Sequence, residues 1–167
     1  MDKALFETMR IMQRSTDELI KANHSVNPNS LLKQKSIALE VELSEFANEV
    51  RFFKFWSNKL SNQDKALTEY VDALHFMLSI ANDLGIEYEG IMEEIADEKE
   101  TDIESAYYWT KKWSLNIYIN PDPVFVWTVA FSWFWVLGEI AGFTQLDIYY
   151  RYLEKNSINH QRQAQGY

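Results

Sequence analysis

The sequence predicts an all-α fold, a single-domain helical bundle of about six helices over residues 1–167. Apolar residues recur at helical spacing, as Leu5, Met9 and Met12 do near the N-terminus. Only five Gly and three Pro are present, too few turn residues for a sandwich or barrel of many short strands. The 167 residues are 47% hydrophobic, which is enough for one domain with its own core.

Several of the predicted helices carry a start signal. Ser30 and Asp64 are suited to cap the second and third, because their side-chain oxygens accept hydrogen bonds from free backbone N–H groups. Thr144 and Asp147 resemble a capping box that opens the sixth. The polar C-terminal end, about residues 155–167, is expected to be a mobile tail. The six stretches cover about residues 2–23, 30–57, 64–85, 88–112, 123–141 and 144–155.

The chain is acidic, with 25 Asp and Glu against 16 Lys and Arg and a formal net charge of −9. This balance disfavours binding to a nucleic acid polymer, because phosphate contacts need clustered basic residues. The excess is local, since residues 87–104 hold nine acids and one Lys. This segment and the Trp-rich residues 107–135 match no known motif, and either is a candidate surface for a protein partner.

No membrane segment is expected. The apolar run at residues 124–137 is shorter than the roughly 20 residues that span a bilayer, so it is predicted to be a buried helix. The N-terminus has no apolar core of a signal peptide. Zero Cys excludes a disulfide scaffold, a thiolate metal site and a Cys nucleophile, and it suits a reducing compartment. A cytoplasmic protein is therefore expected.

Acidic residues stand on helix faces where carboxylates are costly. At about 100° per residue, Glu42, Glu45 and Glu49 share one stripe of the predicted second helix with Phe52 and Trp56. A solvated face should be polar throughout, and a core face should carry no carboxylates. Like charges in a partly buried site need a cation or bound protons to neutralise them.

The predicted third helix repeats the pattern with Glu69 and Asp72, which lie beside Phe76 and Ile80, so this helix is expected to be buried on both sides. Two acidic pairs at i,i+3 on neighbouring helices predict a divalent-metal site, and all-oxygen ligands suit Mg²⁺ or Mn²⁺. A di-iron or di-manganese carboxylate protein is disfavoured, because it needs two Glu-x-x-His motifs. The chain offers only the near match from Asp72 to His75.

The C-terminal segment mixes cations with amides. Lys155, Asn159 and Arg162 recur at short spacing in residues 155–167, and ammonium and guanidinium groups suit phosphate oxygens. An ordinary solvated tail is the alternative on composition alone. Acids that bind metal together with bases that bind phosphate are what a Mg²⁺-dependent phosphoanhydride hydrolase needs.

Three blocks, at residues 42–59, 69–76 and 155–167, together resemble the dimeric, all-α deoxyuridine triphosphatase (dUTPase) family. The two acidic pairs alone would indicate only the wider all-α NTP pyrophosphatases, which include MazG-like enzymes. The third block narrows the resemblance to dUTPase. Val41 stands where MazG-like enzymes often carry a further Glu, which disfavours a general NTP pyrophosphatase.

The resemblance implies a dUTP diphosphatase that hydrolyses dUTP, and also dUDP, to dUMP by attack of a metal-activated water. It implies a homodimer of a bacterium or phage, with two or more Mg²⁺ ions per site once nucleotide is bound. Site residues fall into four groups by role. The metal ligands would be Glu42, Glu45, Glu69 and Asp72; the proton acceptor Glu45, with Glu42 and Glu49 as alternatives; the phosphate contacts Lys155, Asn159, Arg162 and Lys59; and the base or sugar contacts Gln13, Trp56 and His75.

Alternatives stay open at this point. Trp56 is equally suited to a core, His75 to a satisfied buried histidine, and Lys59 to a solvated surface. The enzyme could act on another nucleotide, such as dCTP or a damaged one. A non-enzymatic helical interaction protein is the other alternative, with residues 87–104 and 107–135 as its main surface.

Overall fold

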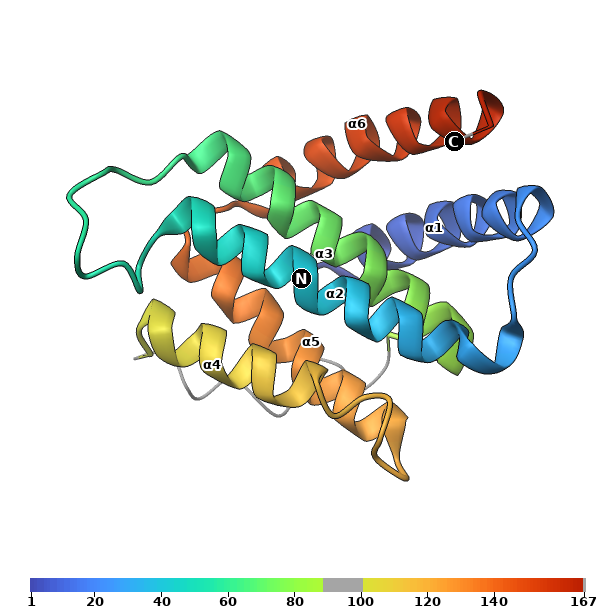
Figure 1. Ribbon diagram of the computed structural model, residues 1–167, viewed down its shortest axis with the longest axis horizontal. Coiled ribbons are helices and arrows are strands. Elements are labelled where there is room, and N and C mark those ends of the chain that lie inside the picture. Colours follow the sequence, from blue (N-terminus) through green and yellow to red (C-terminus); the bar gives the residue numbers. More distant parts are fainter. Residues whose placement is uncertain (89–100, 167) are drawn as a thin grey trace.

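The computed structural model describes residues 1–88 and 101–166. Within these residues the chain forms six helices and no strand, which confirms the predicted all-α fold (Figure 1). The helices are α1 (Lys3–Asn23), α2 (Pro28–Val50), α3 (Gln63–Leu84), α4 (Ile103–Ser114), α5 (Pro123–Ile140) and α6 (Gln145–Ala164).

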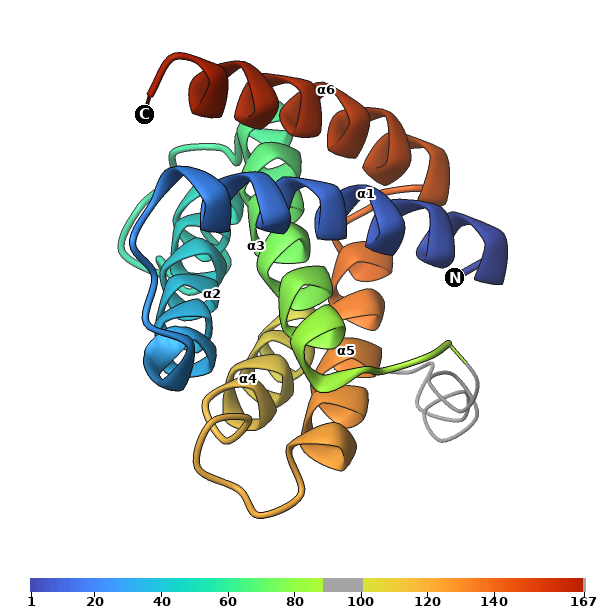
Figure 2. The same cartoon turned by 90° about the vertical axis from the view of Figure 1, so that its right-hand side faces the viewer.

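The helices are arranged as three pairs. α2 lies along α3, α4 lies along α5, and α1 runs beside α6 across one end of the bundle (Figure 1 and Figure 2). α3 is the central element, because α1, α2, α5 and α6 all pack against it. Its residues Val71, Leu74 and Ile80 have no exposed surface, so the prediction of a helix buried on both sides is confirmed.

Aromatic residues lock α5 onto α3. The Tyr70 ring stacks on Phe134 with centroids 4.2 Å apart, and its hydroxyl donates to the Phe134 carbonyl at 3.0 Å. Gly138 allows this approach, since a Cβ there would lie 2.5 Å from the Tyr70 hydroxyl. Trp127 has no exposed surface, and its indole N–H donates to the Met77 carbonyl at 3.0 Å. The apolar run is therefore a packed core helix, as predicted.

One helix in the described part of the chain, α5, is long and apolar enough to cross a membrane by length and composition. More than half of it, 56%, is buried inside the structure. Core helices of soluble proteins pass the same test, so this composition is weak evidence for a membrane segment.

Cap positions agree with the sequence in part. Thr144 and Asp147 form the predicted capping box, with both reciprocal hydrogen bonds present. The two Ser/Asp caps predicted for α2 and α3 are wrong, because Asn27 and Asn62 take those positions and their side chains accept the backbone N–H bonds. The earlier start of α2 places Pro28 in the first turn, where its missing N–H costs nothing.

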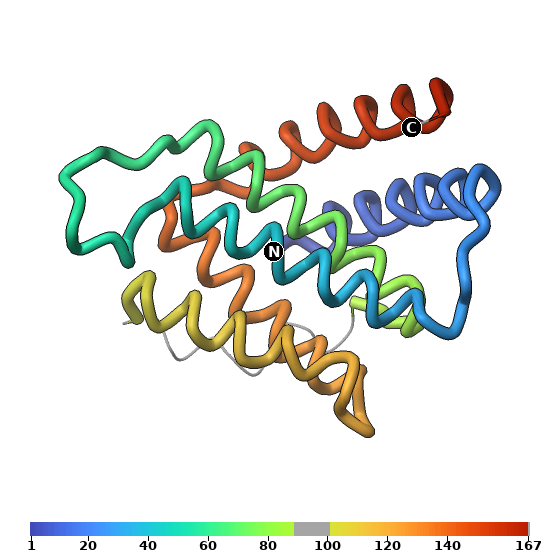
Figure 3. The backbone as a smooth tube through the Cα atoms, viewed as in Figure 1, coloured from blue at the N-terminus to red at the C-terminus, as the bar shows by residue number. Residues whose placement is uncertain are grey.

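The predicted end of α2 near residue 57 is also wrong. α2 ends at Val50, and Arg51 takes a left-handed conformation with φ of 72°. The Arg51 guanidinium then holds the following loop by donating to the Lys59 carbonyl at 3.0 Å and to the Ser57 hydroxyl at 2.8 Å. Figure 3 shows the long connection that results between α2 and α3. The helical stripe therefore stops before Phe52.

Two further boundaries differ from the prediction. The predicted fourth helix, residues 88–112, corresponds to α4 only from Ile103 onward, and most of the acidic segment 87–104 lies outside the described residues. The predicted tail is helical, because α6 continues to Ala164. Its second half docks on α1, where the Asn156 amide donates to the Thr16 hydroxyl at 2.9 Å. The predicted mobility of residues 155–167 stays a prediction.

Candidate active site

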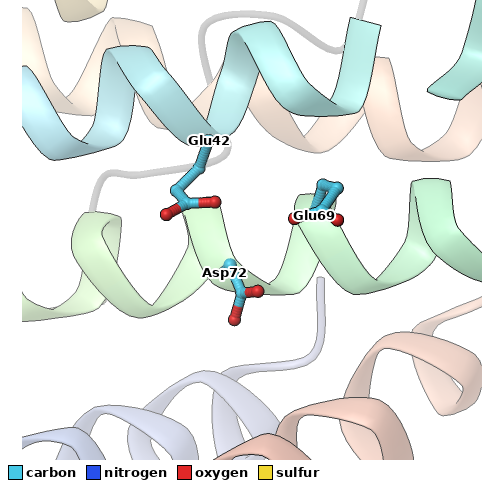
Figure 4. Close-up of side chains that lie close together, drawn as sticks. All are labelled: Glu42, Glu69 and Asp72. Atoms are coloured by element: carbon cyan, nitrogen blue, oxygen red, sulfur yellow. The ribbon is translucent and has the colours of Figure 1, made fainter. Parts of the chain in front are cut away.

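Three carboxylates from two helices meet at one point of the bundle. Glu42 comes from α2, and Glu69 and Asp72 come from α3 at i,i+3 on one face (Figure 4). One oxygen of each can be chosen so that all three lie within 4.8 Å of one another. All three residues are half-buried. This arrangement can hold a metal ion, because convergent carboxylate oxygens are the ligands that hard divalent cations prefer.

The three carboxylates of the cluster carry more negative charge than the nearby cations neutralise. Burial, and then the nearby charges of Asp72 and Glu45, raise the pKa of Glu42 from 4.5 to about 7. Burial also raises the pKa of Glu69, with Asp72 as the next contribution. Burial raises the pKa of Asp72 as well, although the Lys155 ammonium opposes the shift. Such shifts mean that the three acids disfavour being ionised together.

α6 supplies the cations that face this cluster. The Lys155 ammonium lies 2.7 Å from an Asp72 carboxylate oxygen, and the charge of Arg162 acts on the same carboxylate. Glu40 points away from the cluster, as its position on the predicted helix indicates, and pairs with Lys111 of α4. On α2, Glu40 is therefore paired with a lysine on one face, whereas Glu42 on another face lies among acids that nearby cations do not fully neutralise.

Glu45 and Glu49 do not join the three convergent carboxylates. Glu45 is exposed to solvent one turn from Glu42, and its charge contributes to the raised pKa values of Glu42 and Glu69. Glu49 is half-buried, and its charge acts on Glu69. Both lie close enough to influence the site, but neither belongs to the three-oxygen cluster, which among the described residues is formed by Glu42, Glu69 and Asp72.

A cavity of about 540 Å³ opens beside the cluster, between α1, α2, α3 and α6. This volume is in the range of small-molecule sites. Glu42 and Asp72 line one end of it. Most of the predicted nucleotide-contacting residues also line the cavity, although they come from three different helices. They are Gln13 of α1, His75 of α3, and Lys155, Asn159 and Arg162 of α6.

Two predicted ligand contacts are not brought to this cavity in the described structure. Trp56 follows the end of α2, is 64% exposed, and packs edge to face on Phe53 and Phe55. Lys59 is exposed in the same loop, where its carbonyl accepts from Arg51. The cause is the early end of α2, which takes both residues off the helical stripe that carries Glu42.

The wall of the cavity also contains a buried polar network around Asp17. The Asp17 carboxylate accepts from the Gln13 amide at 2.9 Å and from the Ser79 hydroxyl at 2.8 and 2.9 Å. The Lys35 ammonium lies 3.9 Å from Asp17 and 2.5 Å from Asp83. Helical spacing predicts the contact between Gln13 and Asp17, because the two residues are four positions apart and so lie on the same face of α1.

His75 completes this network. Its Nδ1 lies 2.6 Å from the Gln13 side-chain oxygen, and its ring stacks on Tyr152 with centroids 4.3 Å apart. The ring is 6% exposed, and burial lowers its pKa to about 3, so it is neutral at neutral pH. Its Nε2 is buried and has no hydrogen-bond partner among the residues that the structure describes.

The arrangement of carboxylates, facing cations and an adjoining nucleotide-sized cavity agrees with one family. A family model described as dUTPase matches residues 5–167, which is almost the whole chain. The chain belongs to the dUTPase family. The predicted activity of a dUTP diphosphatase is thereby confirmed, and so is the resemblance on which it was based. No curated protein matches the sequence.

Membership of the dUTPase family makes a nucleotide the substrate and decides between an enzyme and a non-enzymatic protein. The protein is an enzyme that hydrolyses dUTP, and the alternative of a purely non-enzymatic helical interaction protein is excluded. The cavity beside Glu42 and Asp72 brings these two predicted metal ligands together with most of the predicted phosphate and base contacts.

Proposed function

We propose that this dUTPase is Mg²⁺-dependent and hydrolyses both dUTP and dUDP to dUMP, releasing pyrophosphate and phosphate respectively. One observation carries the proposal: three half-buried carboxylates converge within 4.8 Å with an excess of negative charge. Glu42, Glu69 and Asp72 would hold the metal, with Glu45 beside them. When bound, Mg²⁺ supplies positive charge to the phosphates and makes a water more acidic.

The chemistry of the donor set supports Mg²⁺ or Mn²⁺. The chain has no Cys, and the group of described residues that can hold a metal ion consists of Glu42, Glu69 and Asp72, so the available ligands are carboxylate oxygens. Such oxygens are typical ligands for hard cations in phosphoryl-transfer sites. Five acids act on one another here, which supports two or more ions once nucleotide is bound. These acids are Glu42, Glu45, Glu49, Glu69 and Asp72.

Glu45 is the proposed acceptor of the proton from the attacking water, with Glu42 and Glu49 as alternatives. Glu45 is exposed to solvent, whereas the three convergent carboxylates are half-buried. A base at the solvent edge can take a proton from water and pass it to bulk.

Lys155, Asn159 and Arg162 are the proposed phosphate contacts. All three line the cavity on α6, at successive turns. Lys155 pairs with Asp72 at 2.7 Å, so a cation bound by Asp72 would release this ammonium for a phosphate oxygen. Movement of residues 155–167 toward the nucleotide is part of the same proposal. Lys59 and Trp56 remain proposed contacts that would need the loop after α2 to move.

The substitution Glu69→Gln tests the proposal. It should abolish Mg²⁺-dependent release of pyrophosphate from dUTP while leaving the helical circular dichroism intact, because Gln keeps the shape of Glu but loses its charge. Glu18→Gln is the matched control, since Glu18 is an exposed acid that pairs with Lys21 on α1. Turnover that survives in Glu69→Gln, or that proceeds equally well in EDTA, would refute the metal site.

A cytoplasmic homodimer is the proposed state of the enzyme. Exposed large apolar side chains on α2 and on the loop that follows it support self-association, as in Ile37, Val41, Phe55 and Leu60. The absence of Cys suits a reducing compartment. Light scattering coupled to size exclusion tests the dimer, for which a mass of one chain at micromolar concentration would contradict the proposal.

A further inference from the structure

Two stripes of residues run side by side along the second half of α6, which lies next to α1 (Figure 2). The cavity stripe lines the cavity and consists of Lys155, Asn159 and Arg162. The docking stripe contacts α1 and consists of Asn156, His160 and Gln163. Each docking residue directly follows a cavity residue in the sequence. Successive residues of a helix are about 100° apart, so contacts that hold the docking stripe also set the direction of the cavity stripe.

The docking stripe meets α1 through hydrogen bonds at both ends. At one end, the Asn156 amide donates to the Thr16 hydroxyl at 2.9 Å. At the other, His24 Nε2 lies 3.0 Å from the Gln163 side-chain oxygen, and the Asn23 amide donates to the Gln163 carbonyl at 3.0 Å. Hydrogen bonds weaken steeply away from their preferred geometry, whereas apolar contacts are non-directional. These contacts therefore favour one rotation of α6 about its own axis.

Thr16 is the centre of this interface. Its side chain is buried, and the hydroxyl that accepts from Asn156 also lies 3.0 Å from His160 Nε2. The same hydroxyl donates to the Met12 carbonyl at 3.3 Å. A hydroxyl has one proton and two lone pairs, so it can take part in all three contacts at once. Asn156 is buried too, so water cannot easily replace the hydroxyl as its partner.

The rotation of α6 matters because the cavity stripe must present three side chains to one ligand. Lys155 is also supported by α3, where it pairs with Asp72 at 2.7 Å. Asn159 and Arg162 lie one and two turns farther along, where α6 contacts α1. The outer surface of a helix lies about 5–6 Å from its axis, so a rotation of about 20° moves an atom there by about 2 Å. Misplacement by about 1 Å can cost an enzyme about 100-fold in rate.

We propose that Thr16 is a positioning residue for phosphate binding, which fixes the rotation of α6 through Asn156 and His160 so that the cavity stripe faces the phosphates. The Thr16 hydroxyl is bonded to α6, so it acts on the nucleotide through that helix. This inference rests on the proposed function, because it takes the cavity stripe as the phosphate contacts.

Thr16→Val tests the proposal, because valine has nearly the shape of threonine but cannot hydrogen-bond to α6. It should raise the KM for dUTP about tenfold and change kcat by less than about threefold, since the phosphates are bound in both the ground state and the transition state. Thr16→Ser keeps the hydroxyl and should restore the KM of the unsubstituted enzyme. Thr8→Val is the matched control on α1, because the exposed Thr8 hydroxyl donates to the Ala4 carbonyl of its own helix.

Deoxyuridine, which has no phosphate, separates this role from a general distortion of the cavity. Its inhibition constant should be the same for Thr16→Val and the unsubstituted enzyme, because the cavity stripe then has no phosphate to bind. Binding of Mn²⁺ alone, measured by calorimetry, should also be unchanged, since the three convergent carboxylates belong to α2 and α3. His160→Ala is a second variant at a half-buried position, and it should raise the KM for dUTP in the same direction but by less.

The proposal is overturned if Thr16→Val and His160→Ala both leave the KM for dUTP unchanged, or if Thr16→Val weakens deoxyuridine binding as much as dUTP binding. It is also overturned if Thr16→Ser behaves like Thr16→Val, because the hydroxyl would then not be what holds α6. If Lys155→Gln and Arg162→Gln also leave the KM unchanged, the cavity stripe does not bind phosphate and the proposed function fails with it. A raised KM in those two variants alone would show that only the role of Thr16 is wrong.

Discussion

The two ends of the nucleotide cavity contain acids with different partners, although burial raises the pKa of Asp17 at one end and those of Glu42 and Asp72 at the other. At the α2–α3 end, Glu42 and Asp72 converge with one lysine ammonium within ion-pair distance. At the other end, Asp17 is bonded to Gln13 and Ser79 and faces the Lys35 ammonium. One set of acids converges around one ammonium, which suits a bound cation, whereas the carboxylate of Asp17 has its hydrogen-bond partners within the protein.

Removing one charge at the metal end should affect catalysis most. Glu42→Gln deletes one oxygen anion of the convergent cluster, so it should lower kcat/KM for dUTP by about a thousandfold, or about 4 kcal/mol in transition-state stabilisation. Steady-state assays of pyrophosphate release measure the effect. Recovery of most of the activity by raising Mn²⁺ to millimolar levels would indicate weaker metal binding; loss of less than tenfold would remove Glu42 from the metal ligands.

Removing one charge at the other end should affect folding more than chemistry. Lys35→Met removes the ammonium group that pairs with Asp17 and Asp83 and leaves both carboxylates without this cationic partner. Removing one partner of a buried ion pair typically lowers the free energy of unfolding by about 3 kcal/mol. Urea denaturation measures the loss. Lys33→Met is the control, because Lys33 is exposed on the same helix and should change stability by less than about 0.5 kcal/mol. Equal stability of the two variants would show that the buried pair is not structural.

The pH dependence of stability without metal should distinguish the ends. The folded pKa of Glu42 is raised to about 7 from 4.5, so the folded state holds its proton more tightly and loses stability as pH rises through that window. His75 has the opposite sign, since its lowered pKa costs stability as pH falls below 6.5. In EDTA, Glu42→Gln should therefore match the unsubstituted protein at pH 4.5 and exceed it at pH 8 by about 1–2 kcal/mol.

The His75 contribution is common to both proteins in that comparison and cancels in the difference. Addition of Mg²⁺ at pH 8 should then stabilise the unsubstituted protein and not Glu42→Gln, because only the former retains the full set of ligands. A difference between the two that is constant from pH 4.5 to pH 8 would mean that Glu42 does not titrate in this range.

The helical bundle and the metal-end acids were predictable because both depend on local spacing. The i,i+3 spacing of Glu69 and Asp72 fixes them on one face of α3 wherever that helix packs. The rest of the network around Asp17 was not predictable, since its contacts with Ser79 and Lys35 join residues of three helices that no local pattern connects. Their types, a buried Lys and a Ser, indicate surface positions when read from sequence alone.

The helix end at Val50 shows the limit of periodicity. Phe52 and Trp56 continue the apolar spacing of α2, so spacing alone extends the helix through them. The backbone leaves the helix at Arg51 instead, in a left-handed conformation that no Gly or Asn announces. The guanidinium bonds to Ser57 and Lys59 that accompany this turn form only once the loop has closed on itself.

Trp56 offers the smallest of the expected effects. It is 64% exposed, so Trp56→Ala should change the free energy of unfolding by less than about 0.5 kcal/mol, whereas Trp127→Ala, at a position with no exposed surface, should cost about 3 kcal/mol or more. The KM for dUTP then decides whether Trp56 flanks the base. A rise of about tenfold in KM without loss of stability would mean that the loop after α2 closes over the bound nucleotide. An unchanged KM would mean that Trp56 stays outside the site, so that the residues already lining the cavity bind the nucleotide by themselves.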